Sequence, residues 1–250
     1  MMKPKVAVFD FASCEGCELQ IMNLEEKVID LIDIVDVVSF REAMKENSND
    51  YDIAFIDGCI VRPLDEKRLK EIRNCANILV AMGSCACFTG INGLRKQFTD
   101  EDVKRTVYGN AIIENNPYFD VFQPKAIDEV VKVDHYIYGC PIDRNELAEV
   151  ITSLVMGKKP DIPNYPVCVE CKQKENICVF DYGNFCIGPV TRAGCGAICP
   201  TNNCGCEGCR GLVNDPDTES ELEVLQRYGL SLDDALDRFE MFCYQKGVVK

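Results

Sequence analysis

A dense run of cysteines near the end of the chain constrains its fold more than any other sequence feature. Nine of the 17 cysteines fall within the 42 residues from Cys168 to Cys209. They stand at positions 168, 171, 178, 186, 195, 199, 204, 206 and 209. Almost no helix or strand periodicity survives between them, so the segment lacks the pattern of an ordinary apolar core. Something other than hydrophobic packing must hold it together.

Three kinds of cross-link can organise such a run: disulfides, structural zinc and iron-sulfur clusters. Zinc ribbons usually pair two CxxC knuckles about a dozen or more residues apart. Here the CxxC pairs open and close the run, and five further cysteines lie between them. Eight cysteines suffice for two four-thiolate sites, and thiolate-only ligation with irregular spacing is typical of [4Fe-4S] clusters. The spacing therefore favours iron-sulfur clusters over zinc.

The start of the chain argues against disulfides. Residues 1–5 read Met-Met-Lys-Pro-Lys and lead directly into the apolar run 6–11, without the pattern of a signal peptide. We therefore expect a cytoplasmic protein, and disulfides are rare in that compartment. The sequence contains no run of 18 or more apolar residues, so we expect no membrane span.

The charge and the histidine content exclude several classes of function. Acidic residues number 41 against 27 basic ones, which gives a formal net charge of −14. Nucleic acid is therefore not an expected partner. His135 is the single histidine and tryptophan is absent. Histidine-based zinc catalysis and a Ser-His-Asp triad consequently have almost no support.

The first part of the chain alternates strand and helix patterns. Buried strands are predicted at 5–11, 35–40, 52–57, 78–82 and 130–138, and amphipathic helices at 18–34, 63–74 and 143–156. This alternation predicts an α/β fold with a flavodoxin-like, doubly wound parallel sheet. Three prolines and a glycine between 157 and 166 mark a linker. We expect domains at 1–160 and 161–250, the second being a small irregular iron-sulfur domain with C-terminal helices.

Four further cysteines follow the predicted strands. Cys14 and Cys17 follow the first strand, Cys85 the fourth and Cys140 the fifth. Ligands of open α/β sheets sit at the carboxyl ends of the strands, so these thiols can converge on one edge as a four-cysteine site. The helix that begins near Glu18 would aim its N-terminus at this anionic site. Two side chains after the third strand, Asp57 and Cys59, share this edge and can replace a ligand.

Taken together, these motifs resemble the small subunit of [NiFe] hydrogenases. The matching residues are Cys14-x-x-Cys17, Gly83-x-Cys85-Ala86, Gly139-Cys140-Pro141 and Cys186-Ile-Gly-Pro-Val-Thr-Arg-Ala-Gly-Cys195. They follow the family's order and cover nearly the whole chain. Within the family, Cys168-Val-Glu-Cys171 and Cys195-Gly-Ala-Ile-Cys199-Pro200 resemble the cytoplasmic methanogen-type and sulfhydrogenase-type subunits.

The resemblance implies three [4Fe-4S] clusters, with ligands transferred residue by residue. The proximal cluster would be held by Cys14, Cys17, Cys85 and Cys140. The distal cluster would be held by Cys168, Cys171, Cys178 and Cys186, with Cys168 in place of the histidine of membrane-bound relatives. The medial cluster would be held by Cys195, Cys199, Cys206 and Cys209. Cys204 can substitute for Cys206, but Cys206-x-x-Cys209 reproduces the family's closing pair.

The resemblance also implies a function in electron relay. Electrons would pass between the nickel-iron centre of a large subunit and a further redox subunit, during H2 oxidation or H2 production. By the same resemblance, that further subunit would be a flavoprotein, ferredoxin-like or linked to heterodisulfide reductase. The sequence leaves open whether the terminal acceptor is NAD(P), F420, ferredoxin or a heterodisulfide. The sequence lacks the two CxxC pairs that hold nickel, so the H2 chemistry would reside on the large subunit.

Two alternatives remain beside this interpretation. The first is a complex I-type cluster subunit, whose family places two adjacent cysteines in its first motif and lacks the cysteine-rich tail. The second is a zinc-stabilised interaction module without redox activity.

Overall fold

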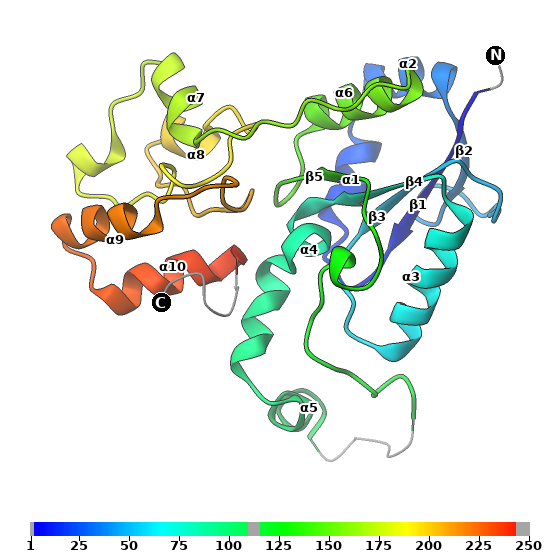
Figure 1. Cartoon of the computed structure of the whole chain (residues 1–250), viewed down its shortest axis with the longest axis horizontal. Coiled ribbons are helices and arrows are strands. Elements are labelled where there is room, and N and C mark those ends of the chain that lie inside the picture. Colours follow the sequence, from blue (N-terminus) through cyan, green and yellow to red (C-terminus); the bar gives the residue numbers. More distant parts are fainter. Residues whose placement is uncertain (1–2, 110–115, 244–250) are drawn as a thin grey trace.

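A five-stranded parallel sheet forms the centre of the first part of the chain. The computed structural model describes residues 3–109 and 116–243. The strands are β1 (Lys5–Asp10), β2 (Asp36–Phe40), β3 (Ile53–Asp57), β4 (Ile78–Met82) and β5 (His135–Ile137), and their order is β2-β1-β3-β4-β5 (Figure 1). Every pair of neighbouring strands is parallel. This order is that of the flavodoxin-like doubly wound fold, which confirms the predicted fold class.

Helices cover both faces of this sheet, which is why its strands read as continuous apolar runs. One face packs Val6, Val8 and Phe55 against α1 (Gly16–Met22), α2 (Glu26–Ile34) and α6 (Arg144–Val155). The other face packs Ala7 and Ile56, among others, against α3 (Pro63–Cys75). Neighbouring residues of one strand thus enter different cores, as the period of two requires.

Two local features differ from the expectation. The predicted helix 18–34 is two helices, because Glu25 adopts a φ of 55° between α1 and α2. Strand β5 has three residues, and a 3-10 turn, η3 (Ile127–Glu129), precedes it. The fourth strand continues directly into α4 (Gly83–Phe88), which is followed by η1 (Gly90–Gln97) and α5 (Asp100–Tyr108).

The C-terminal part is mostly irregular, as the cysteine run predicts. Its elements are α7 (Val167–Gln173), η4 (Val179–Tyr182), α8 (Ile198–Thr201), α9 (Thr218–Arg227) and α10 (Leu232–Cys243). A small core joins apolar side chains of α7, α9 and α10 to three cysteines, namely Cys171, Cys186 and Cys206. Some cysteines of the run are therefore buried in the hydrophobic core of the C-terminal part.

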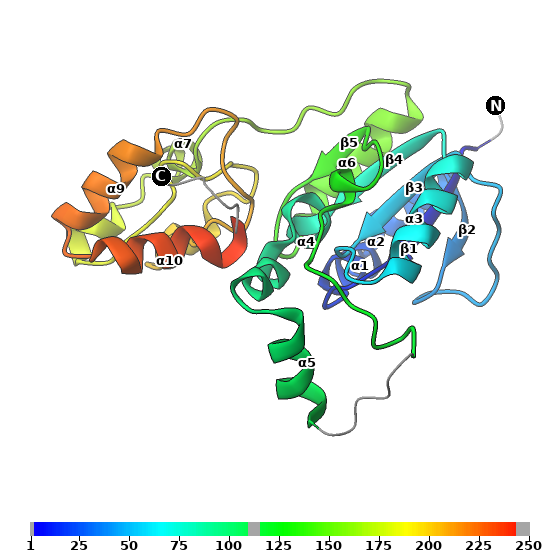
Figure 2. The same ribbon diagram turned by 60° about the horizontal axis from the view of Figure 1, so that its bottom comes forward.

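The two parts of the chain lie side by side and touch. Figures 1 and 2 show the C-terminal part beside α4, beyond the end of the sheet where β4 and β5 finish. Helix α10 packs against η1 and α4. A buried ion pair joins Arg210 of the C-terminal part to Glu146 of α6, with Nη2 2.7 Å from Oε1.

Candidate metal centres

The first set of cysteines lies at the carboxyl edge of the sheet. Cys14 follows β1, Cys17 lies in the first turn of α1, Cys85 lies in the first turn of α4, and Cys140 follows β5. Cys17 is buried, whereas Cys14 and Cys140 are exposed. The ends of β1, β4 and β5 thus bring the four predicted side chains from three separate segments to one edge of the sheet.

The thiols of the first set raise one another's pKa values. The pKa of Cys85 is raised to about 12, mainly by burial and then by the charges of Cys59, Asp57, Cys140 and Cys14. Burial also raises the pKa of Cys17, again with contributions from Cys85 and Cys140. Thiols in such surroundings stay protonated unless a metal provides positive charge, so metal binding would release their protons.

Glycines keep the space beside two of these sulfurs clear. A Cβ atom built on Gly83 would lie 2.3 Å from Cys17 Sγ, and one built on Gly16 would lie 3.3 Å from Cys14 Sγ. Gly83 also has a φ of +84°, which L side chains rarely adopt. The backbone is therefore shaped around the cysteine sulfurs, which suits a site that holds a bulky inorganic group there.

Asp57 and Cys59 lie near this first set, as their place after the third strand predicts. Both are buried, and Asp57 Oδ2 has no hydrogen-bond partner. Burial raises the pKa of Asp57 to about 6. Cys59 Sγ donates to the carbonyl of Ala12 at 3.5 Å, so this thiol already has a backbone partner. A ligand role for either residue stays a prediction.

The second set comprises Cys168, Cys171, Cys178 and Cys186. Cys168 and Cys171 lie one turn apart on α7, and Cys178 is the residue before η4. Burial raises the pKa of Cys168 to about 12, and the charges of Cys186, Cys171 and Cys178 add to this shift. The four thiols of the set are therefore neighbours, although they come from three segments.

Hydrogen-bond donors surround the sulfurs of this second set. The backbone N–H groups of Gly188 and Cys206 donate to Cys186 Sγ at 3.4 and 3.2 Å. The Asn176 side chain donates to Cys171 Sγ at 3.6 Å. Donors of this kind stabilise thiolate ligands and tune the potential of the cluster they hold.

The third set joins Cys195, Cys199 and Cys209, with two candidates for the fourth position. Burial raises the pKa of Cys199, and the charges of Cys195 and Cys204 add to the shift. Cys209 lies near Cys195 and Cys199. Cys204 is exposed. Cys206 is buried, lies near Cys209, and is hydrogen-bonded to the Gly208 backbone and the Thr191 side chain.

Direct contacts link the three sets in series. Burial raises the pKa of Cys209 to about 11, while a hydrogen bond from the Cys140 backbone lowers it against that trend. The hydroxyl of Ser84, next to Cys85, donates to the carbonyl of Cys209. The third set thus touches the first, and the bond from Cys206 to Cys186 Sγ joins the third set to the second.

The donor chemistry suits iron-sulfur clusters. Every cysteine with a described side chain is free. Within the described residues, no three His, Cys, Asp or Glu side chains converge on a point that would suit a single metal ion. The thiolates of a [4Fe-4S] cluster each bind a different iron, so they need not converge on one point.

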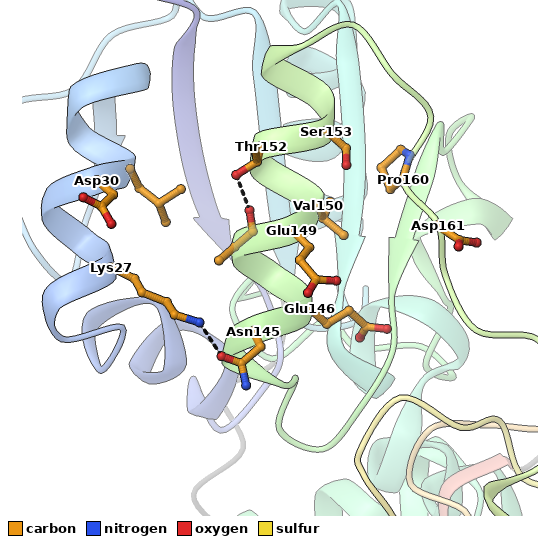
Figure 3. A pocket seen from close by; sticks show the side chains of 12 residues that line it. Lys27, Asp30, Asn145, Glu146, Glu149, Val150, Thr152, Ser153, Pro160 and Asp161 are labelled. Carbon is orange, nitrogen blue, oxygen red and sulfur yellow. Dashed lines mark hydrogen bonds between the residues drawn. The ribbon is translucent and has the colours of Figure 1, made fainter. Parts of the chain in front are cut away.

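A surface groove of about 460 Å³ lies apart from the cysteines, between α2 and α6 (Figure 3). Lys27 reaches across it and donates to the Asn145 side chain at 2.5 Å. Glu146 lines its edge and extends from α6 on the side away from α2 (Figure 3). The groove contains no cysteine, and the carboxylate of Glu146 is held by Arg210.

Ser84, Glu146 and Arg210 are the residues of this region that the motifs did not single out. The available signal for Arg210 is its position directly after Cys209.

None of the helices in the described part of the chain is long and apolar enough to cross a bilayer.

A comparison with protein families finds a match for the first part of the chain. The family model described as "NADH ubiquinone oxidoreductase, 20 Kd subunit" matches residues 14–154. The match includes strands β2 to β5 and all four cysteines of the first set. It ends before the second and third sets.

Curated relatives extend over the cysteine-rich part as well. The sulfhydrogenase 2 subunit delta of Pyrococcus furiosus is 34% identical over 224 residues, which are 89% of this chain and 92% of the relative. A vhu subunit of the F420-non-reducing hydrogenase of Methanocaldococcus jannaschii is 31% identical, over 84% of this chain and 82% of the relative.

Solved structures show the same fold. A chain of an NAD+-reducing [NiFe]-hydrogenase in the H2-reduced state is 26% identical, with a TM-score of 0.59, over 65% of this chain and 96% of that chain. A chain of the Ni-Fe-Se hydrogenase of Desulfomicrobium baculatum is 15% identical, with a TM-score of 0.51, over 88% of this chain and 98% of that chain.

Proposed function

The chain belongs to the small-subunit family of the [NiFe] hydrogenases, and we propose that it relays electrons between the nickel-iron centre of a large subunit and a further redox subunit. It is thus an oxidoreductase subunit, as its relatives in the sulfhydrogenases and the F420-non-reducing hydrogenases are. The observation that carries the relay is the serial contact of the three cysteine sets, from first to third to second.

Each cysteine set would hold one [4Fe-4S] cluster. When bound, such clusters accept and release one electron at a time with little rearrangement. The first set (Cys14, Cys17, Cys85, Cys140) would be proximal to the large subunit. The third set (Cys195, Cys199, Cys206, Cys209) would be medial, and the second (Cys168, Cys171, Cys178, Cys186) distal. The chain's own task is to hold these ligands at fixed spacing and to supply hydrogen bonds to their sulfurs.

A face beside the first set fits the large subunit. Cys14 and Cys140 are exposed, and the apolar side chains of Leu19 and Met22 on α1 are 52% and 48% exposed. Exposed apolar side chains next to a half-covered site are typical of a protein interface. The further redox subunit would accept electrons beside the second set.

The hydrogenase interpretation is favoured over a complex I-type subunit by the extent of the similarity. The family model named after NADH ubiquinone oxidoreductase covers residues 14–154 only. The hydrogenase relatives cover 84–89% of the chain, so they include much of the cysteine-rich part.

Metal analysis tests the function directly. The protein, purified without oxygen together with its large subunit, is expected to contain about twelve irons and as many acid-labile sulfides. It is also expected to be brown and to reduce a viologen dye with H2. Zinc in place of iron, or a colourless protein, would exclude the relay and leave the zinc-stabilised module.

Paired substitutions decide between the two candidates for the third set. Cys206→Ser is expected to lower the iron content and to change the EPR spectrum of one cluster, because Cys206 is buried beside Cys209. Cys204→Ser is expected to leave both unchanged, since Cys206-x-x-Cys209 reproduces the closing pair of the family. The opposite pattern would make Cys204 the ligand.

A further inference from the structure

Arg210 lies buried between the first and third cysteine sets. Its side chain is 2% exposed, although it carries a charge. Its Nε donates to the carbonyl of Ala193 at 2.7 Å, and its Nη1 donates to the carbonyl of Tyr138 at 2.6 Å. Ala193 stands two residues before Cys195, and Tyr138 stands two residues before Cys140. Arg210 therefore fixes a ligand loop of the third set against a ligand loop of the first.

Glu146 holds the other side of this guanidinium. Nη1 and Nη2 of Arg210 donate to the two carboxylate oxygens of Glu146 at 2.9 and 2.7 Å. This bidentate geometry orients the guanidinium plane. Gly194 leaves room for it, since a Cβ there would lie 2.3 Å from Arg210 Nη2. All the side-chain nitrogens of Arg210 are thereby engaged by protein groups.

The positive charge of Arg210 acts on the thiolates beside it. Arg210 directly follows Cys209, and it interacts electrostatically with Cys195 and Cys209. Arg192 is a second buried guanidinium nearby, and its hydrogen-bond partners are neutral: Pro163, Asn164, Leu212 and Asn214. A reduced cluster carries one more negative charge than an oxidised one. A fixed cation in a buried site therefore favours the reduced state, and a fixed anion favours the oxidised state.

We propose that the Arg210–Glu146 pair is a positioning and tuning device for the relay: it fixes the third set against the first and sets the reduction potential of the cluster in the third set. This inference rests on the proposed function, because it needs a cluster in that set. With clusters bound by the two sets, one electron would pass between the first set and the third in either direction, and no bond would be broken.

Neutral substitutions of the two partners give the test. Arg210→Gln removes the cation, so at a fixed applied potential the ratio of reduced to oxidised cluster in the third set is expected to fall about tenfold, a shift of about 59 mV for one electron. Glu146→Gln leaves Arg210 charged and unbalanced, because a guanidinium does not deprotonate. That ratio is then expected to rise. Arg210→Lys, which keeps the charge, is expected to restore most of the potential.

The measurement is an EPR-monitored redox titration of the holoprotein in its complex, with the third cluster assigned through Cys206→Ser. Arg73→Gln serves as the control for the loss of an ion pair elsewhere, since Arg73 forms a partly exposed ion pair with Asp134 at 2.9 Å, beside the amino ends of β4 and β5. Shifts of opposite sign in the Arg210→Gln and Glu146→Gln variants support the proposal. Unchanged potentials, or shifts of one sign with only a lower melting temperature, would reduce the pair to a structural contact.

Failure of the tuning and failure of the proposed function give different results in these experiments. If Arg210→Gln does not fold, the upward shift in Glu146→Gln alone decides, and its absence overturns the proposal. If the wild-type protein contains no iron-sulfur cluster, the proposed function fails and not the tuning alone.

Discussion

Removal of iron from the holoprotein is expected to unfold residues 161–250 while the parallel sheet persists. The core of the C-terminal part is small, and Cys171, Cys186 and Cys206 are among its buried members. Without metal these thiols leave the segment with short helices and irregular loops only. For scale, a structural zinc site contributes about 10–16 kcal/mol to the folding of a small domain. The sheet, in contrast, has apolar cores on both faces that contain few cysteines.

Hydrogen exchange measured by mass spectrometry would show which part of the chain unfolds when iron is removed. Peptides from 161–250 are expected to lose protection after anaerobic chelation, whereas peptides from β1, β3 and β4 keep it. The first part of the same molecule is the internal control. Equal loss in both parts, or in neither, would contradict the predicted division at residues 160 and 161.

Gly83→Ala is expected to eliminate the cluster of the first set, and with it the electron transfer from the large subunit. The new Cβ would lie 2.3 Å from Cys17 Sγ, and Gly83 has a φ of +84°. Cys17 is buried in the first turn of α1, so its sulfur has little room to retreat. About four of the roughly twelve irons should be missing, and H2-dependent dye reduction should fall by more than tenfold.

Gly229→Ala separates the steric effect from backbone strain. Gly229 has a φ of +94°, but a Cβ there would meet nothing within 4 Å. This control should lose some stability and keep its iron and its activity. Iron analysis of both variants, purified in parallel, measures the difference. A Gly83→Ala protein with full iron content would show that the first set holds no cluster, or that α4 shifts to make room.

Much of this fold follows from local sequence patterns. The strands of a doubly wound sheet are buried on both faces, so runs such as 5–10 and 78–82 stand out from their surroundings. The gathering of Cys14, Cys85 and Cys140 at one edge then follows, because the strands before them are parallel. These predictions rest on regularities that a single stretch of sequence carries.

The remaining features depend on contacts between distant segments. The pairing of Arg210 with Glu146 joins residues 64 positions apart. No sequence motif around either residue predicts that the other is its partner. The break between α1 and α2 arises at Glu25, whose φ of 55° is not signalled by a glycine. Cys206 is buried and Cys204 is exposed, a difference that their spacing does not encode, and which of them is a ligand stays a prediction.

The return of α10 to the first part limits how the molecule can move. This helix packs on η1, and Glu240 accepts a hydrogen bond from Gln97 at 3.2 Å. The C-terminal part is therefore attached at its far end as well as through the linker at 157–166 (Figure 2). A segment fastened at two points cannot swing as a hinged domain would. The two attachments therefore hold the cysteine sets of the C-terminal part at a fixed place beside those of the first part.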